Sequence, residues 1–166
     1  SPAQDIMKYK HNMLKELRAY VRSKKPDMSM GIEWVSDPTS MYADYIHAVS
    51  PNLYITHKDK NGVPATNYAP MYYYTFPEVY TTNRDIYNNQ NVPFRCNLTF
   101  MRGWREDAAV YRCRATLDET PVYQAYLAKI DALRDKFRDT VLNGAFRDTD
   151  LAKSSNPNMY YSTFEN

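Results

Sequence analysis

Residues 28–35, which read MSMGIEWV, determine the fold class expected for this 166-residue chain. Large apolar residues stand at every second position from Met28 to Trp34, and they alternate with small residues and the carboxylate of Glu33. A period of two is typical of a β-strand, whose successive side chains point to opposite sides. The stretch therefore predicts a strand with one bulky apolar face and one smaller face that carries a carboxylate near the strand's end.

Helices are predicted on both sides of this strand. Apolar residues recur at spacings of three and four over residues 4–25, which indicates an amphipathic helix. After the strand, Asp37 can serve as an N-cap with Pro38 at the first helical position. The second helix predicted there runs from Pro38 and stops before Pro51.

The second half of the chain repeats this alternation of elements. Residues 94–101, FRCNLTFM, alternate between apolar and polar types and predict a second strand. A short helix is expected over residues 106–112 and a long one over residues 120–143, with Thr120 as its cap. Residues 51–93 are mostly loop by composition.

The order of these elements indicates an α/β fold. Strands that are separated by helices pair in parallel through helical crossovers. Residues 1–150 are expected to form this unit, and residues 151–166 a polar tail that looks loose. Parallel sheets place their reactive groups beyond the carboxyl ends of the strands, so the chemistry of this chain is expected at that edge.

Composition narrows the classes of function. The formal net charge of +2 is too close to zero for a dedicated nucleic-acid binder, whose domain is usually clearly basic. No apolar run reaches the length of a membrane span. Four glycines leave no phosphate-binding loop, and two cysteines form neither a disulfide scaffold nor a four-cysteine zinc site. The three histidines have no metal-ligand spacing. We expect no metal and no cofactor.

Five side chains are expected to follow the two predicted strands. Glu33 and Asp37 end or follow the first strand, and Arg102, Trp104 and Arg105 follow the second. Two carboxylates that flank a scissile bond can hydrolyse a glycoside. Indole and guanidinium groups suit a sugar ring and its hydroxyls. Alternatives are a buried ion pair for Glu33, helix capping for Asp37 and core packing for Trp104.

The loop between the two strands adds an aromatic cluster over residues 72–80. Tyr74 within it and Arg84 just after it are expected on the same side of the sheet as the two carboxylates. Arg84 and Arg102 are also the partners expected for Glu33 if that carboxylate is buried. The chain has 16 tyrosines in all, each with a flat apolar face and one hydroxyl.

Four runs carry a resemblance to a known class of proteins: MSMGIEWVSD at 28–37, YTFPEVYTTNR at 74–84, LTFMRGWREDAAVY at 98–111 and LNGAFRD at 142–148. Together they resemble the C-terminal part of a TIM-barrel glycoside hydrolase, of the large hydrolase-like type found in gut Bacteroides-type bacteria. The resemblance implies a partial (β/α) barrel of two to three βα units, an exported protein and a carbohydrate substrate. It also implies that Glu33 and Asp37 are catalytic, with Tyr74, Arg84, Arg102, Trp104 and Arg105 contacting substrate.

A whole barrel takes about 250 residues, more than this chain supplies. On this resemblance residues 28–35 and 94–101 would be the seventh and eighth strands, and an oligomer or the remainder of the barrel would cover the exposed sheet edges. The alternative function is a non-catalytic module that binds carbohydrate or protein through its tyrosines.

Overall fold

The computed structural model describes residues 2–33, 37–49, 74–83, 92–107, 116–156, 159 and 161–166. Four short strands form a parallel sheet in the order β1-β2-β3-β4, which is also their order along the chain. They are β1 (Gly31–Glu33), β2 (Tyr45–Val49), β3 (Tyr80–Asn83) and β4 (Arg105–Glu106). The chain is therefore a mixed α/β protein, as its sequence predicts.

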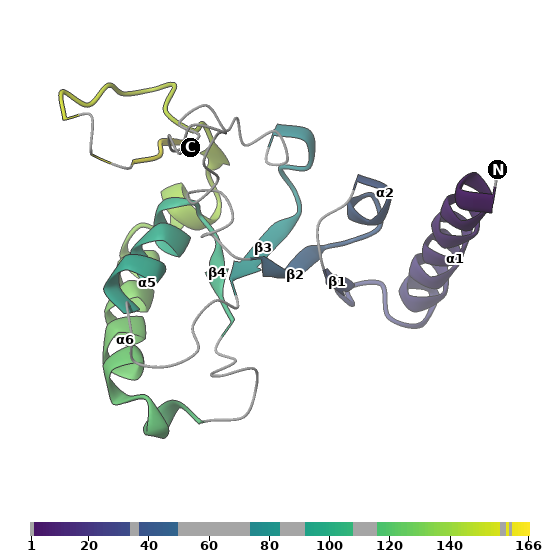
Figure 1. Cartoon of the computed structure of the whole chain (residues 1–166), viewed down its shortest axis with the longest axis horizontal. Coiled ribbons are helices and arrows are strands. Elements are labelled where there is room, and N and C mark those ends of the chain that lie inside the picture. Colours follow the sequence, from purple (N-terminus) through teal and green to yellow (C-terminus); the bar gives the residue numbers. More distant parts are fainter. Residues whose placement is uncertain are drawn as a thin grey trace.

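Helices lie at the two ends of this sheet. Helices α5 and α6 lie together at the β4 end, whereas α1 lies at the β1 end (Figure 1). After α6 comes a π-helical turn, and the antiparallel strands β5 and β6 pair with each other. The bounds are α1 Pro2–Lys24, α2 Asp37–Ser40, α5 Val92–Met101, the 3₁₀ turn Leu117–Glu119, α6 Pro121–Lys136, the π-helical turn Arg138–Leu142, β5 Ala145–Phe146 and β6 Phe164–Glu165.

Two predicted helices are confirmed. Helix α1 covers the segment expected from its period of three and four, and α6 begins with Pro121 at its first position. The helix predicted to reach residue 143 is shorter, because α6 ends at Lys136 and Arg138–Leu142 form a separate π-helical turn. The side chain of Thr120 does not cap α6, because its hydroxyl donates back to the carbonyls of Thr116 and Leu117. Of the first predicted strand, residues 31–33 form β1, and residues 34–35 lie outside the described residues.

The strand predicted at residues 94–101 is wrong, because this segment is helix α5. Val92, Cys96 and Thr99 follow a helical spacing and are fully buried. Val92 and Cys96 form one core cluster with Tyr123 and Ile130 of α6. The apolar residues of this segment fit both a period of two and a helical period, and packing against α6 selects the helix.

The helix predicted from Pro38 is also wrong beyond its first turn. Helix α2 ends at Ser40, and Tyr45–Val49 form β2, with Ile46 completely buried. Ile46 belongs to a second core cluster that contains Val79 and Trp104. Strand β3 lies in the region expected to be loop, and β4 includes Glu106, where a short helix was expected. Residues 108–112 of that helix lie outside the described residues.

Candidate functional site

The carboxyl ends of the four parallel strands gather polar residues that lie far apart in the sequence. Glu33 of β1 stands in register with His47 of β2, and Asn83 of β3 with Glu106 of β4. Asp107 follows β4 and its backbone N–H donates to the Asn83 carbonyl at 2.8 Å. Since reactive groups of parallel sheets sit at this edge, we take it as the candidate functional site.

Residues along each strand alternate between two faces of the sheet. Ile46 and Thr81 point to the buried side, whereas Glu33, Tyr80 and Arg105 are exposed. The face that carries Glu33 is referred to below as the open face, and the face that packs on α5 as the helix face. Along β1, Gly31 and Glu33 are therefore exposed on the open face, and Ile32 between them lies on the other face.

His47 joins three strands on the open face. Its Nδ1 lies 3.2 Å from Oδ2 of Asp107 and 3.4 Å from the hydroxyl oxygen of Thr82. Its Cα is paired with that of Glu33, so the two residues stand side by side on the same face of the sheet. A carboxylate beside one ring nitrogen fixes the orientation of an imidazole and leaves the other nitrogen to act on a ligand.

Aromatic and cationic groups continue the open face. The guanidinium carbon of Arg105 lies 4.1 Å from the centre of the Tyr80 ring, and Tyr80 is 48% exposed. The ring of Tyr45 lies over Gly31, where a Cβ added to the glycine would collide with it. A side chain at position 31 would displace the ring, so the glycine allows Tyr45 to approach β1 closely.

The helix face carries a buried polar network centred on Glu106. The amide of Asn83 donates to Thr99 Oγ1 at 2.8 Å and to Glu106 Oε2 at 3.3 Å. Thr99 in turn donates to the carbonyl of Arg95 at 3.0 Å, so β3, β4 and α5 are tied together by polar contacts. Oε1 of Glu106 is buried with no hydrogen-bond partner among the described residues.

Burial changes the ionisation of this network. Desolvation raises the pKa of Glu106 to about 7, even though the Arg134 charge and the hydrogen bonds from Thr99 and Asn83 act to lower it. Burial, followed by the Glu106 charge, raises the pKa of Cys96 to about 12. The same two causes raise the pKa of Tyr123. The carboxyl of Glu106 therefore takes up a proton far more readily than an exposed glutamate.

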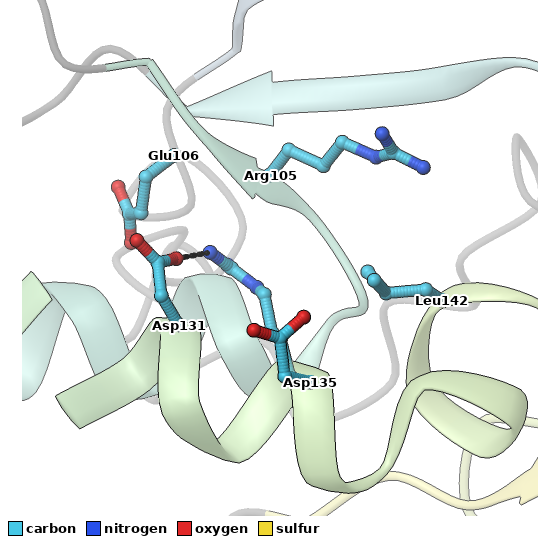
Figure 2. Close-up of a pocket in the computed structure, with 6 residues that line it drawn as sticks. Arg105, Glu106, Asp131, Asp135 and Leu142 are labelled. Atoms are coloured by element: carbon cyan, nitrogen blue, oxygen red, sulfur yellow. Dashed lines mark hydrogen bonds and ion pairs between the residues drawn. The ribbon is translucent and has the colours of Figure 1, made fainter. Parts of the chain in front are cut away.

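A cavity of about 390 Å³ lies between β4 and α6 on this side of the sheet. In Figure 2, Glu106 and Asp131 lie at one end of it, and the Arg105 guanidinium and Leu142 at the other. Arg134, which also lines the cavity, is 7% exposed; it donates to the Trp104 carbonyl at 2.6 Å and pairs with Asp131 at 3.4 Å. The cavity is lined by groups of both charges.

The structure brings only some of the predicted site residues to the sheet edge. Glu33 is exposed on the open face, which does not fit the buried ion pair considered for it. Arg105 lies in β4 against Tyr80. Arg102 points elsewhere and pairs with Asp148 at 3.7 Å.

The prediction that Trp104 stacks on a sugar is wrong. Its side chain is 2% exposed within the core cluster under the sheet, so its ring has no face left for a sugar. Tyr74 is 48% exposed and its ring lies 6.4 Å from that of Phe146, near the β5–β6 pair. Burial and the charge of Asp150 raise its pKa. Arg84 lies outside the described residues, and of Asp37 only the backbone is described, as the first residue of α2.

Sequence reasoning missed His47, Asp107, Asn83 and Glu106 as residues of this edge. His47 lies in a segment that the sequence predicts to be helical, and Asn83 lies in a region predicted to be mostly loop. Neither residue was therefore expected at a strand end. Glu106 and Asp107 stand two and three residues after the apolar Trp104, and this change from apolar to acidic residues is a signal that could have marked a strand end.

No protein-family model, no curated protein and no solved structure matches the chain. Within the described part of the chain, no group of three or more histidine, cysteine, aspartate or glutamate residues could hold a metal ion. No described helix is both long enough and apolar enough to cross a membrane.

Proposed function

We propose that this chain is part of a carbohydrate-acting hydrolase whose substrate lies on the open face, at the carboxyl ends of the strands. One observation carries the proposal: Glu33 is paired in register with His47 on that face, and the Asp107 carboxylate lies 3.2 Å from the imidazole of the same histidine. Two carboxylates separated by the width of a reacting group are what glycoside hydrolysis requires.

The spacing of the strands supports this pairing. Neighbouring strands lie about 4.8 Å apart, so the backbone of Glu33 is one strand spacing from that of His47. Asp107 reaches back to within 3.2 Å of the same imidazole. The two carboxylates are thus expected on the scale of roughly 5–10 Å that acid and base pairs of glycosidases span.

The chemistry assigns complementary roles to the two carboxyl groups. One, in its acid form, gives a proton to the glycosidic oxygen as the bond from that oxygen to the anomeric carbon breaks. The other takes a proton from a water molecule, whose oxygen bonds to the anomeric carbon. His47 is a positioning residue in this scheme, because its Nδ1 lies 3.2 Å from Oδ2 of Asp107.

The rest of the open face suits a sugar ring. Tyr80 offers an exposed aromatic surface, and the guanidinium of Arg105 beside it can donate to hydroxyl groups. Tyr45, 36% exposed, lies next to β1 and extends the same surface. These groups would hold the substrate while the carboxylates act.

We further propose that the sheet is a segment of a (β/α) barrel. Four parallel strands in sequential order, with α5 between β3 and β4 and α6 after β4, follow the connectivity of such a barrel. On this proposal the open face is the inner face of the barrel, and α5 and α6 belong to its outer ring.

A non-catalytic carbohydrate-binding module is the second candidate. The exposed Tyr80 ring with Arg105 against it favours this alternative, since aromatic stacking binds sugars without any acid or base. The two functions share a surface and differ in whether the carboxylates matter for turnover.

One experiment tests both functions. The full chain is screened against a panel of aryl glycosides and polysaccharides for release of reducing sugar, and against the same polysaccharides for binding by affinity electrophoresis. We expect hydrolysis that falls at least about 100-fold in Glu33→Gln and in Asp107→Asn, whereas the exposed control Glu165→Gln keeps wild-type activity. Binding that depends on Tyr80 without any hydrolysis would favour the binding module. Neither binding nor hydrolysis with any glycan would refute both.

A further inference from the structure

Helix α1 presents a continuous apolar stripe whose side chains are exposed. Its residues are Ile6, Tyr9, Met13, Leu17 and Tyr20, whose exposed fractions are 66%, 74%, 58%, 45% and 62%. They recur at spacings of three and four, so they lie along one side of the helix. Large apolar side chains at this density on one surface are unusual for a helix that faces only water.

The orientation of α1 is set by contacts on a different side of the helix. Arg18 and Arg22 both form ion pairs with Asp44, at 3.1 and 2.8 Å. Leu14, one turn before Arg18, is buried. Nε2 of His11 lies 2.9 Å from the Tyr42 hydroxyl. These contacts hold α1 at the β1 end of the sheet (Figure 1), and they lie on a different side of the helix from the exposed stripe.

The stripe is symmetric about Met13. Ile6 and Tyr20 each lie seven residues from it, and Tyr9 and Leu17 each lie four. If a second copy of the helix packs antiparallel with Met13 at the centre, each aromatic ring meets an aliphatic side chain of the partner, and the two Met13 side chains meet each other. A twofold axis requires such self-complementarity of the surface that it pairs.

The area of the stripe is sufficient for such a pair. Five side chains of roughly 200 Å² each, about 60% exposed on average, present on the order of 600 Å² per copy. Two copies would cover at most about 1,200 Å², which reaches the lower end of the range for specific interfaces. Lys8 and Lys15 lie on the other side of the helix, so they add no like-charge contact at the seam.

We infer that the chain forms a symmetric dimer through an antiparallel pair of α1 helices centred on Met13. The stripe gives a defined surface to the oligomer that the sequence predicts, and the inference does not depend on the proposed hydrolase activity. A second copy is the occupant because the pattern complements itself about one residue.

The mass of the full chain in solution tests this inference. By analytical ultracentrifugation at micromolar concentrations, we expect a dimer whose dissociation constant rises at least 10-fold in Met13→Lys, because two ammonium groups would meet at the centre. Met41→Lys is the matched control, since Met41 is 59% exposed and lies outside the stripe. It should leave the dimer unchanged. Circular dichroism of both variants checks that α1 stays helical.

Cross-linking tests the antiparallel register. Met13→Cys should form a disulfide-linked dimer under mild oxidation above the wild-type background, whereas Ile6→Cys should not, because its two thiols would lie about 21 Å apart along the helices. A monomeric wild type, a dimer indifferent to Met13→Lys, or equal cross-linking at both positions would overturn the inference. So would a monomer that binds vesicles of anionic phospholipid through the same stripe.

Discussion

Replacing Glu106 by glutamine should abolish one pH-dependent component of the stability of this protein. Glu106 lies on the helix face of the sheet, where Asn83 donates to its Oε2 and Oε1 has no partner among the described residues. Burial raises its pKa from 4.5 to about 7. The folded state therefore keeps the proton of this carboxyl over a pH range in which the unfolded chain has already released it.

The sign and the size of the effect follow from this difference. Because the folded pKa is raised, the contribution of Glu106 is fully present below about pH 4.5 and is lost as the pH rises toward 7. The difference between 7 and 4.5 is about 2.5 units, and each unit corresponds to about 1.4 kcal/mol. The wild type should thus lose on the order of 3 kcal/mol from this residue alone between pH 4 and pH 8.

Glutamine has nearly the same shape as a protonated glutamate and does not ionise. In Glu106→Gln the amide oxygen can still accept from Asn83, so near pH 4 the free energy of unfolding should stay within about 1 kcal/mol of the wild type. Near pH 8 the variant should be more stable by up to about 3 kcal/mol. The measurement is urea unfolding of both proteins at pH values from 4 to 9, followed by circular dichroism.

The difference between variant and wild type is the informative quantity, because other titrating groups contribute equally to both. Glu33→Gln is the matched control for the change of a glutamate to glutamine, since Glu33 is exposed on the open face. If the difference for Glu106→Gln is the same at pH 4 and pH 8, the burial of an unpaired carboxyl oxygen at position 106 is refuted.

Two further predictions concern the contacts that join the elements. Burial raises the pKa of Asp44, but the Met30 N–H bond and the charges of Arg18 and Arg22 outweigh it and hold the pKa below 3.8. Asp44→Asn should therefore cost on the order of 1–2 kcal/mol at pH 7 in urea unfolding, and the loss should shrink as the pH falls below 3.8 and the carboxylate takes up its proton. A loss that does not change over this pH range would contradict this. Arg134→Met should lower the free energy of unfolding by about 2–3 kcal/mol, because it removes the buried hydrogen bond to the Trp104 carbonyl at 2.6 Å. An unchanged midpoint of thermal unfolding would show that this bond contributes nothing to stability.

The elements that could be predicted are those whose sequence pattern fits only one type of secondary structure. Helix α1 and helix α6 are long and strongly periodic, and Pro121 marks the start of the second. The alternation around Ile32 and Glu33 also has one solution, because only a strand puts them on opposite faces. From these elements the α/β class follows.

The candidate site was less predictable because it is assembled from short strands. Glu33 could be assigned to the sheet edge from its own segment, whereas His47 and Asp107 come together only when β2 and β4 take their places. Strands of two to five residues hold too few side chains for a period to be recognised, and parallel pairing joins segments distant in the chain.

The sequence by itself determined the class of fold, the two long helices and the absence of phosphate-binding glycine motifs, because these depend on local spacing and residue type. Only the tertiary structure decided that residues 92–101 are helical, that Trp104 is core and that Glu106 is buried. Each of these depends on a neighbour distant in the chain: α6 covers one side of α5, and the sheet covers Trp104. Burial against such neighbours outweighs local preference wherever a segment fits two patterns equally well.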